Sequence, residues 1–226
     1  HNLKSTLEKS FSKDEIGEMC CLGRCHENNA FHFQGHNYSG PSIDKLDSIL
    51  NEAKSYSDNY FVKNIGHQIL TGAQLSLDEI SNRLKAFLSQ KPEALLEKIK
   101  ISGIRGRGGA GFPMAIKLEG CAKAPGTQKF IVCNADEGDP GSYSDRYLLE
   151  HQPYLVLIGL WISAYITGAN KAVVYIRAEY PESVKIMDQA VQDFINHGFV
   201  GNSILGSNFN LDFKIIKAQG AYICGE

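Results

Sequence analysis

The sequence predicts an α/β fold with a mostly parallel sheet. Three short apolar runs are typical of buried strands, at residues 129–134, 172–176 and 213–217. Helical patterns separate them, at 145–166 with a break at Pro153 and at 183–196. Strands that alternate with helices indicate a parallel sheet, and ligands bind such sheets at the carboxyl ends of the strands.

The chain before the first of these strands is predicted to be mainly helical. We expect a short helix over 2–10 and a short strand over 30–34. Ser42 is predicted to cap a helix that starts at Pro41, and Ser76 to cap a second one. A further helix, over 93–100, leads into a glycine-rich stretch.

Composition sets wide limits. The chain has 226 residues, 43% of them hydrophobic, and a formal net charge of -2, so bulk charge gives no support for nucleic-acid binding. The most apolar stretch, 154–169, is too short for a bilayer span, which predicts a buried helix and no transmembrane segment. Because no secretory signal precedes its six cysteines, we expect a reduced, cytoplasmic protein. The first residue is His1 and no turn follows Glu226, so we expect a fragment at both ends.

The glycine-rich stretch, Ser102–Lys117, predicts a phosphate site. Its glycines include a G-x-G-x-x-G spacing at Gly106, Gly108 and Gly111, and two arginines add positive charge. Pro113 is expected to be the first residue of a helix that ends near Lys117. A Rossmann fingerprint requires a strand before the first glycine, whereas a helix is predicted here. A glycine-rich turn between two helices is the alternative.

A cluster of carboxylates follows the first predicted strand. Asp136, Glu137 and Asp139 lie in the segment N-A-D-E-G-D-P-G. A solvated turn is the structural interpretation, since Asn, Asp, Pro and Gly are common in turns. Magnesium-phosphate binding fits the same residues, as do hydrogen bonds to ribose hydroxyls and to ring N–H groups.

Four motifs in order resemble one family. They are R-G-R-G-G-A-G-F-P, C-N-A-D-E-G-D-P-G, V-Y-I-R-A-E-Y-P and G-A-Y-I-C-G-E. Together they resemble the FMN-binding, NADH-oxidising flavoprotein of respiratory complex I. They are also similar to the diaphorase subunits of NAD-reducing hydrogenases and of NAD-dependent formate dehydrogenases. The resemblance implies an oxidoreductase that passes hydride between NAD(H) and FMN and single electrons to iron-sulfur centres.

The resemblance also implies a set of cofactor-binding residues. They are Gly106, Arg107, Gly108, Gly109, Gly111, Phe112, Lys117, Asn134, Asp136, Glu137, Asp139, Tyr222, Gly225 and Glu226. Phe112 would contact NADH, and a carboxylate near Asp139 would repel a 2′-phosphate, which favours NADH over NADPH. No side chain is expected to act as a catalytic acid or base, because the cofactors carry the chemistry.

The N-terminal cysteines carry a second resemblance. C-L-G-R-C-H-E is similar to the end of the thioredoxin-like [2Fe-2S] subunit that partners this flavoprotein, which implies Cys21 and Cys25 as cluster ligands. That family uses four thiolates, and the first pair would lie upstream of His1, so a vestigial site is the alternative. Zinc on Cys21, Cys25, His32 and His36 is a further hypothesis, although the spacer is short for a zinc finger.

These resemblances divide the chain into three parts. Residues 1–44 would end a thioredoxin-like [2Fe-2S] domain, 45–101 would form a helical lead-in, and 102–226 would begin an FMN- and NADH-binding domain. A [4Fe-4S] cluster would belong to a C-terminal domain beyond Glu226, so these residues alone are expected to be poorly active. The expected partners are iron-sulfur subunits of a redox complex. Leu118 and Gly120 depart from the complex I pattern, and the alternative function is a cofactor-free structural or assembly subunit.

Overall fold

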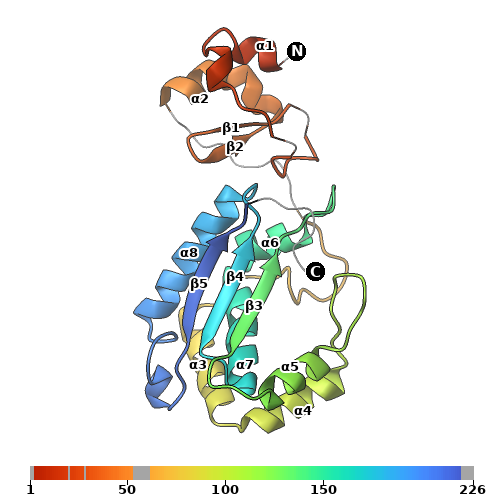
Figure 1. The fold of residues 1–226 in the computed structure, drawn as a ribbon, viewed down its shortest axis with the longest axis vertical. Helices are drawn as coiled ribbons and strands as arrows, with labels where there is room; N and C mark the ends of the chain where they lie inside the picture. Colours follow the sequence, from red (N-terminus) through yellow and green to blue (C-terminus); the bar gives the residue numbers. More distant parts are fainter. Residues whose placement is uncertain (1–2, 20, 28, 53–61, 220–226) are drawn as a thin grey trace.

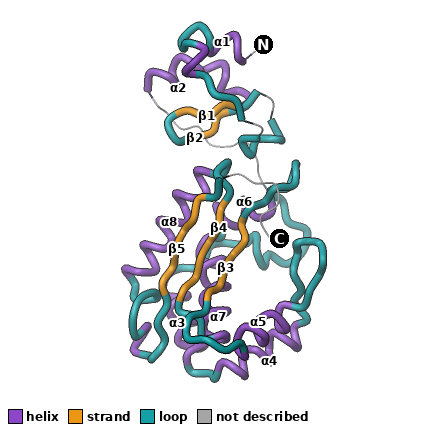
Figure 2. Tube along the Cα trace, viewed as in Figure 1, coloured by secondary structure: helices purple, strands orange, loops and turns teal. Residues whose placement is uncertain are grey.

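The computed structural model describes residues 3–19, 21–27, 29–52 and 62–219. Figure 1 shows a small N-terminal unit above a larger α/β layer. Figure 2 shows the same arrangement by element type, with the strands of the larger unit side by side. Two sheets are present in the described residues, one of two strands and one of three.

The N-terminal unit is a hairpin packed against short helices. Its elements are α1 (Leu3–Leu7), a 3₁₀ turn (Lys13–Glu15), β1 (Phe31–Phe33), β2 (His36–Tyr38), a 3₁₀ helix (Gly40–Lys45) and α2 (Leu46–Glu52). Phe31 and Tyr38 stack across the hairpin, with ring centroids 5.1 Å apart, and form a small core with Leu46 and Ile49. The helix predicted from Pro41 begins as a 3₁₀ helix, and the prediction of Ser42 as its N-cap is wrong, because Ser42 lies within that turn.

The larger unit contains a parallel sheet of three strands, as predicted. The strands are β3 (Phe130–Ala135), β4 (Lys171–Ile176) and β5 (Asp212–Lys217), in the order β3-β4-β5. The register aligns Ala135 with Ile176 and Ile176 with Lys217, so all three strands end at one edge. Residues that follow these strands therefore gather at a single end of the sheet.

Helices before the sheet have well-defined ends. They are α3 (Leu77–Leu88) and α4 (Pro92–Ser102), which precede α5 (Met114–Lys123). Ser76 caps α3 as predicted, because its hydroxyl accepts a hydrogen bond from the Glu79 N–H at 3.3 Å. Pro113 occupies the N-cap position of α5 instead of its first turn, and α5 runs past Lys117 to Lys123. Ala115 and Leu118 pack against α4 and α7, and the helix ends where Ala124, the residue before Pro125, is extended.

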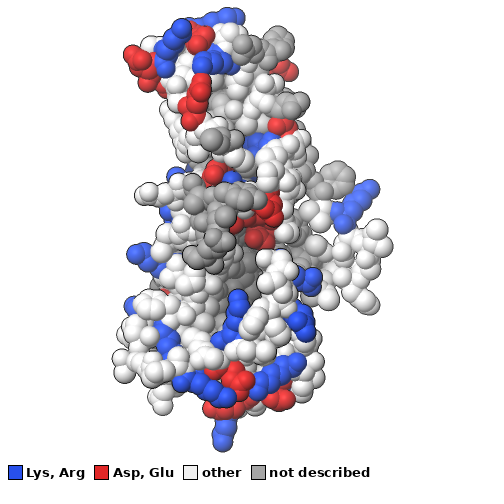
Figure 3. Space-filling view, turned by 45° about the vertical axis from the view of Figure 1, so that its right-hand side comes forward, with Lys and Arg blue, Asp and Glu red and all other residues white. Residues whose placement is uncertain are grey.

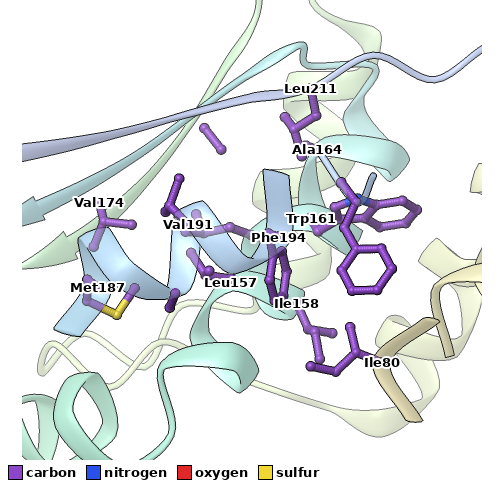
Figure 4. Packing of buried hydrophobic residues seen from close by; sticks show 14 of the residues in the cluster. Ile80, Leu157, Ile158, Trp161, Ala164, Val174, Met187, Val191, Phe194 and Leu211 are labelled. Carbon is purple, nitrogen blue, oxygen red and sulfur yellow. The ribbon is translucent and has the colours of Figure 1, made fainter. Parts of the chain in front are cut away.

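Helices between the strands build the core. They are α6 (Ser144–His151), α7 (Pro153–Thr167) and α8 (Pro181–Asn196), and a 3₁₀ turn (Ile204–Gly206) precedes β5. Trp161 is fully buried and donates a hydrogen bond from its ring nitrogen to the Phe199 carbonyl at 3.0 Å. In Figure 4 Leu157, Trp161 and Ala164 of α7 lie in one cluster with Phe194 of α8, which joins the two helices. Apolar area removed from water in this cluster is the main stabilising contribution of the unit.

The predictions of a break at Pro153 and of a buried helix after it are confirmed. The break at Pro153 is present, because α6 ends at His151 and α7 starts at Pro153. The stretch 154–169 is largely buried, and α7 contains it up to Thr167. Among the described residues, no helix has both the length and the apolarity that crossing a bilayer requires.

Candidate functional site

The carboxylate turn, which we define as Asp136–Tyr143, begins where β3 ends. The Asn134 side-chain oxygen accepts the Asp136 N–H at 3.1 Å, which starts the turn. One Asp136 carboxylate oxygen, Oδ2, is buried and has no hydrogen-bond partner within the described part of the chain. A buried acceptor without a donor is costly, so this oxygen calls for a donor from elsewhere.

Glu137, the next residue, has donors for its carboxylate within the chain. Only 8% of it is exposed, and its carboxylate accepts the Ser144 hydroxyl at 3.0 Å and the backbone N–H groups of Asp145 and Arg146 at 3.1 and 3.2 Å. These donors form the first turn of α6, whose free N–H groups and positive dipole favour an anion. The Glu137 carboxylate therefore caps α6 in this structure.

Arg177 and Tyr180, which follow β4, both contact Glu137, the first at its backbone carbonyl and the second at its carboxylate. Arg177 donates a hydrogen bond to the Glu137 carbonyl and pairs with Glu179 at 3.1 Å. Burial lowers the pKa of Arg177, but the Glu179 hydrogen bond and charge more than offset this and leave that pKa raised. The Tyr180 hydroxyl lies 3.3 Å from Glu137, and burial together with the Glu137 charge raises the pKa of Tyr180. Tyr180 therefore stays protonated and can donate.

The glycine loop, defined as Ile104–Pro113, is an exposed hairpin between α4 and α5. The Gly106 N–H donates to the Phe112 carbonyl at 2.9 Å, and the Arg105 guanidinium donates to the Gly111 carbonyl at 3.0 Å. Gly109 has φ +97°, a conformation that favours glycine. A Cβ added at Gly108 or Gly109 would meet nothing within 4 Å, so these glycines leave open space rather than a close contact with this chain.

Two predicted cofactor residues meet at the end of this loop. The Lys117 ammonium lies 5.7 Å from the centroid of the Phe112 ring, a cation–π distance. Phe112 is 44% exposed, so its ring is accessible to a planar ligand. Figure 1 shows the glycine loop projecting beside the sheet from α4 and α5.

A salt bridge between Lys100 and Glu119, at 3.5 Å, joins α4 to α5. Red and blue side chains alternate at that end of the molecule in Figure 3.

The cysteine loop, defined as Cys21–Cys25, faces the carboxylate turn across a cavity of about 410 Å³. Cys21, Cys25, Asp139, Tyr143, Arg177 and Tyr180 are among the residues that line it. No glycine-loop residue is among those lining residues. The structure thus brings Asp139 together with the two predicted cluster ligands, which lie more than a hundred residues away in sequence.

The Cys25 thiol lies in a polar environment. Burial raises its pKa, but hydrogen bonds from the Gly141 backbone and the Cys21 side chain more than offset this and leave the pKa below its usual range. Within the described residues no three His, Cys, Asp or Glu side chains form a group that could hold a metal ion. The zinc alternative on Cys21, Cys25, His32 and His36 is therefore wrong, since all four residues are described and do not form such a group.

The remaining predicted site residues that the structure describes do not line the cavity between the cysteine loop and the carboxylate turn. Gly106, Arg107, Gly108 and Gly109 are exposed along the glycine loop, and Asn134 is exposed at the end of β3. Tyr222, Gly225 and Glu226 lie outside the described residues. Leu118 is 6% exposed and packs in the α4, α5 and α7 cluster, while Gly120 is exposed.

Sequence reasoning missed Arg177, Tyr180 and Gly23 as parts of this region. The motif V-Y-I-R-A-E-Y-P was recognised as a whole, but no signal assigned roles to its arginine and tyrosine. A polar and aromatic cluster directly after a buried strand could have indicated them, since such positions face the binding edge of a parallel sheet.

Comparisons with known proteins match the part of the chain that contains the glycine loop and the carboxylate turn. Residues 99–226 match a family model described as the Nuo51 FMN-binding domain. An NADH-quinone oxidoreductase subunit of Rhizobium meliloti is 46% identical over 142 residues, which is 63% of this chain and 34% of that protein. An NADH-quinone oxidoreductase subunit of Aquifex aeolicus is 39% identical over 184 residues, covering 80% of this chain and 40% of that protein.

Hydrogenase relatives and a solved structure also match. The HoxS subunit alpha of the NAD-reducing hydrogenase of Cupriavidus necator is 40% identical over 149 residues, covering 66% of this chain and 25% of that protein. The crystal structure of an NAD⁺-reducing [NiFe]-hydrogenase in the H₂-reduced state matches with a TM-score of 0.68 and 28% identity over 93% of this chain and 37% of that one. The chain thus spans about 25–40% of the length of these proteins.

Proposed function

Because this chain belongs to the Nuo51 FMN-binding domain family, we propose that it is part of a flavoprotein module that passes hydride between NAD(H) and FMN. The observation that carries the proposal is the buried Asp136 oxygen without a partner, among the described residues, at the carboxyl end of β3. Flavin ring N–H groups and ribityl hydroxyls are donors of the kind that this oxygen lacks. FMN would supply the acceptor for hydride and release electrons singly.

The protein's own residues would bind and orient the cofactors. Asp136 and Asn134 would contact the flavin from the end of β3, and the open backbone of the glycine loop with Lys117 would bind its phosphate. Phe112 would stack against the nicotinamide. Glu137 would act through α6 and the turn, because its carboxylate is already occupied by that helix.

The specificity for NADH over NADPH would come from the cavity beside Asp139. Its carboxylate would accept hydrogen bonds from ribose hydroxyls and would repel a 2′-phosphate. A preference of the full-length protein for NADPH over NADH would contradict this role of Asp139.

Iron-sulfur chemistry is the second part of the proposal. Cys21 and Cys25 would supply two of the four thiolates that a [2Fe-2S] cluster takes, and their position on one cavity wall supports this role. A [4Fe-4S] cluster would belong to a longer chain. We propose iron-sulfur subunits of a cytoplasmic hydrogenase or formate dehydrogenase as partners, since hydrogenase subunits are among the relatives.

Arg107 provides a test of the phosphate site. Arg107 is exposed and forms no ion pair within the described residues, so its guanidinium is available to an anion. Arg107→Ala should weaken FMN binding by about tenfold, the range expected for a lost charge-assisted hydrogen bond of roughly 1.5 kcal/mol. Isothermal titration with FMN measures this effect. Lys85→Ala, which removes an exposed cation on α3, is the control and should leave affinity unchanged.

The function itself is tested by NADH-dependent reduction of FMN in the full-length protein. Under anaerobic conditions we expect NADH to bleach the visible flavin band, and NADPH to do so much more slowly. Asp139→Asn should narrow the difference between the two nucleotides. A full-length protein that retains no flavin after gentle purification and FMN addition would instead support the cofactor-free structural role.

A further inference from the structure

Gly23, in the middle of the cysteine loop, lies directly against the Tyr180 ring. A Cβ built at Gly23 would be 2.5 Å from Tyr180 Cε1 and 2.8 Å from Cδ1, closer than any real contact of this kind. The backbone there has φ +67°, which also favours glycine. Tyr180 is 1% exposed, and Arg146 and Arg177 pack against its ring. Glycine at this position is required for the loop to approach the ring.

Hydrogen bonds hold the same part of the loop from two sides. The Asn37 side-chain amide donates to the Leu22 carbonyl at 2.9 Å and to the Glu179 carbonyl at 2.7 Å. The Arg146 guanidinium, on α6, donates to the Gly23 carbonyl at 3.1 Å. The loop is thus attached to the hairpin, to the segment after β4 and to α6.

The Tyr180 ring is itself held by two cations. The Arg146 and Arg177 guanidinium carbons lie 5.5 and 5.1 Å from the ring centroid, and both side chains are less than a tenth exposed. Arg177 also donates to the Glu137 carbonyl, in the carboxylate turn. One aromatic ring therefore connects the cysteine loop to the carboxylate turn.

We propose that Tyr180 is a positioning residue that seats the cysteine loop beside the carboxylate turn, so that Cys21, Cys25 and Asp139 line one cavity. The seat consists of the Tyr180 ring, the Asn37 amide and the Arg146 guanidinium. Any role of this seat in electron transfer rests on the proposed function. The contacts that form the seat do not depend on that function.

Hydrogen exchange of the full-length protein tests the seat directly. Gly23→Ala should speed amide exchange over residues 21–27 by about tenfold, because the added Cβ forces the loop off the ring. Tyr180→Leu should do the same by removing the ring. Tyr180→Phe keeps the ring, so amide exchange over residues 21–27 in this variant should stay close to that of the wild type.

Gly35→Ala is the matched control. Gly35 also has a positive φ, +80°, and lies in the same N-terminal unit, but the nearest atom to an added Cβ is the end of Lys185 at 3.8 Å. This variant should leave exchange over 21–27 unchanged. The amides of β4 serve as an internal reference for the stability of the whole fold. If exchange over 21–27 rises only when exchange in β4 rises too, the variant destabilises the whole fold and the proposed seat is contradicted.

A functional measurement separates this inference from the proposed function. With ferricyanide as acceptor, Gly23→Ala should raise the KM for NADH severalfold, because the wall opposite Asp139 moves, while kcat stays within about twofold. Unchanged exchange in both Gly23→Ala and Tyr180→Leu overturns the seat. Absence of NADH oxidation in the wild type as well overturns the proposed function and leaves the exchange result to decide the seat.

Discussion

At the scale of single residues, adjacent carboxylates have different tasks. Asp136 has a buried oxygen without a partner in the described residues, whereas the Glu137 carboxylate is fully used by the first turn of α6. Both residues follow the same strand and look equivalent in sequence. They differ in the donors that surround them, because the first turn of α6 lies at the Glu137 carboxylate.

The cap formed by Glu137 gives the first stability prediction. Glu137→Gln removes the negative charge from the α6 N-terminus and weakens three hydrogen bonds, so the free energy of unfolding should fall by about 1–2 kcal/mol. Urea denaturation followed by circular dichroism measures the change. Glu97→Gln, at an exposed partner of Lys100, is the control and should change stability by less than about 0.5 kcal/mol.

Asp145 gives a prediction about pH. Burial raises the pKa of its carboxyl, and the neighbouring Glu137 charge adds to this. Because the folded-state pKa lies above the unfolded one, the stabilising contribution of the protonated form is complete below the unfolded pKa and is lost as pH rises through the folded pKa. The side-chain amide introduced by Asp145→Asn does not titrate, so this variant does not lose stability in this way as pH rises. The unfolding free energy of the variant relative to the wild type should therefore grow as pH rises from about 4 to 7.

Urea titrations at several pH values in that window measure the difference. A difference that stays constant with pH would contradict the raised pKa of Asp145. Ser144→Ala, which keeps the carboxyl and removes its hydroxyl neighbour, should retain a pH dependence of the same sign.

At the scale of elements, α7 carries the core of the larger unit. Leu157 is fully buried and belongs to the cluster that α7 shares with the sheet and α8. Leu157→Ala should lower the free energy of unfolding by about 2–5 kcal/mol, because it removes buried methyl groups and leaves a cavity. Ile195→Ala, at a 45% exposed position of α8, is the control and should cost less than about 1 kcal/mol. Equal losses in the two variants would contradict this assignment of the core.

Elements with strong local patterns could be predicted from the sequence. The three apolar runs correspond to β3, β4 and β5. Ser76 caps α3 and the helix breaks at Pro153, as expected. The strand β2 was missed because His36–Tyr38 is only three residues long and carries no alternating pattern of its own. The end of α5 was predicted too early, near Lys117, since the helix continues to Lys123 and stops at Ala124, the residue before Pro125.

At the scale of the whole molecule, long-range contacts decide how the site is assembled. Asn37 reaches Glu179 across 142 residues and Arg146 reaches Gly23 across 123. The motifs identified the residues of the glycine loop and the carboxylate turn. They could not show that Asp139 shares a cavity with Cys21 and Cys25, because that cavity exists only once the N-terminal unit packs on the end of the sheet.

The central claim is that the carboxylate turn binds flavin through Asp136. FMN titrated into the full-length protein, followed by flavin fluorescence, tests it most directly. Asp136→Ala should weaken binding by about tenfold or more, since a carboxylate contact to the cofactor is worth roughly 1.5–3 kcal/mol. Asp188→Ala, a carboxylate on α8, should leave the affinity at the wild-type value. Equal affinities of the wild type and Asp136→Ala for FMN would contradict the account.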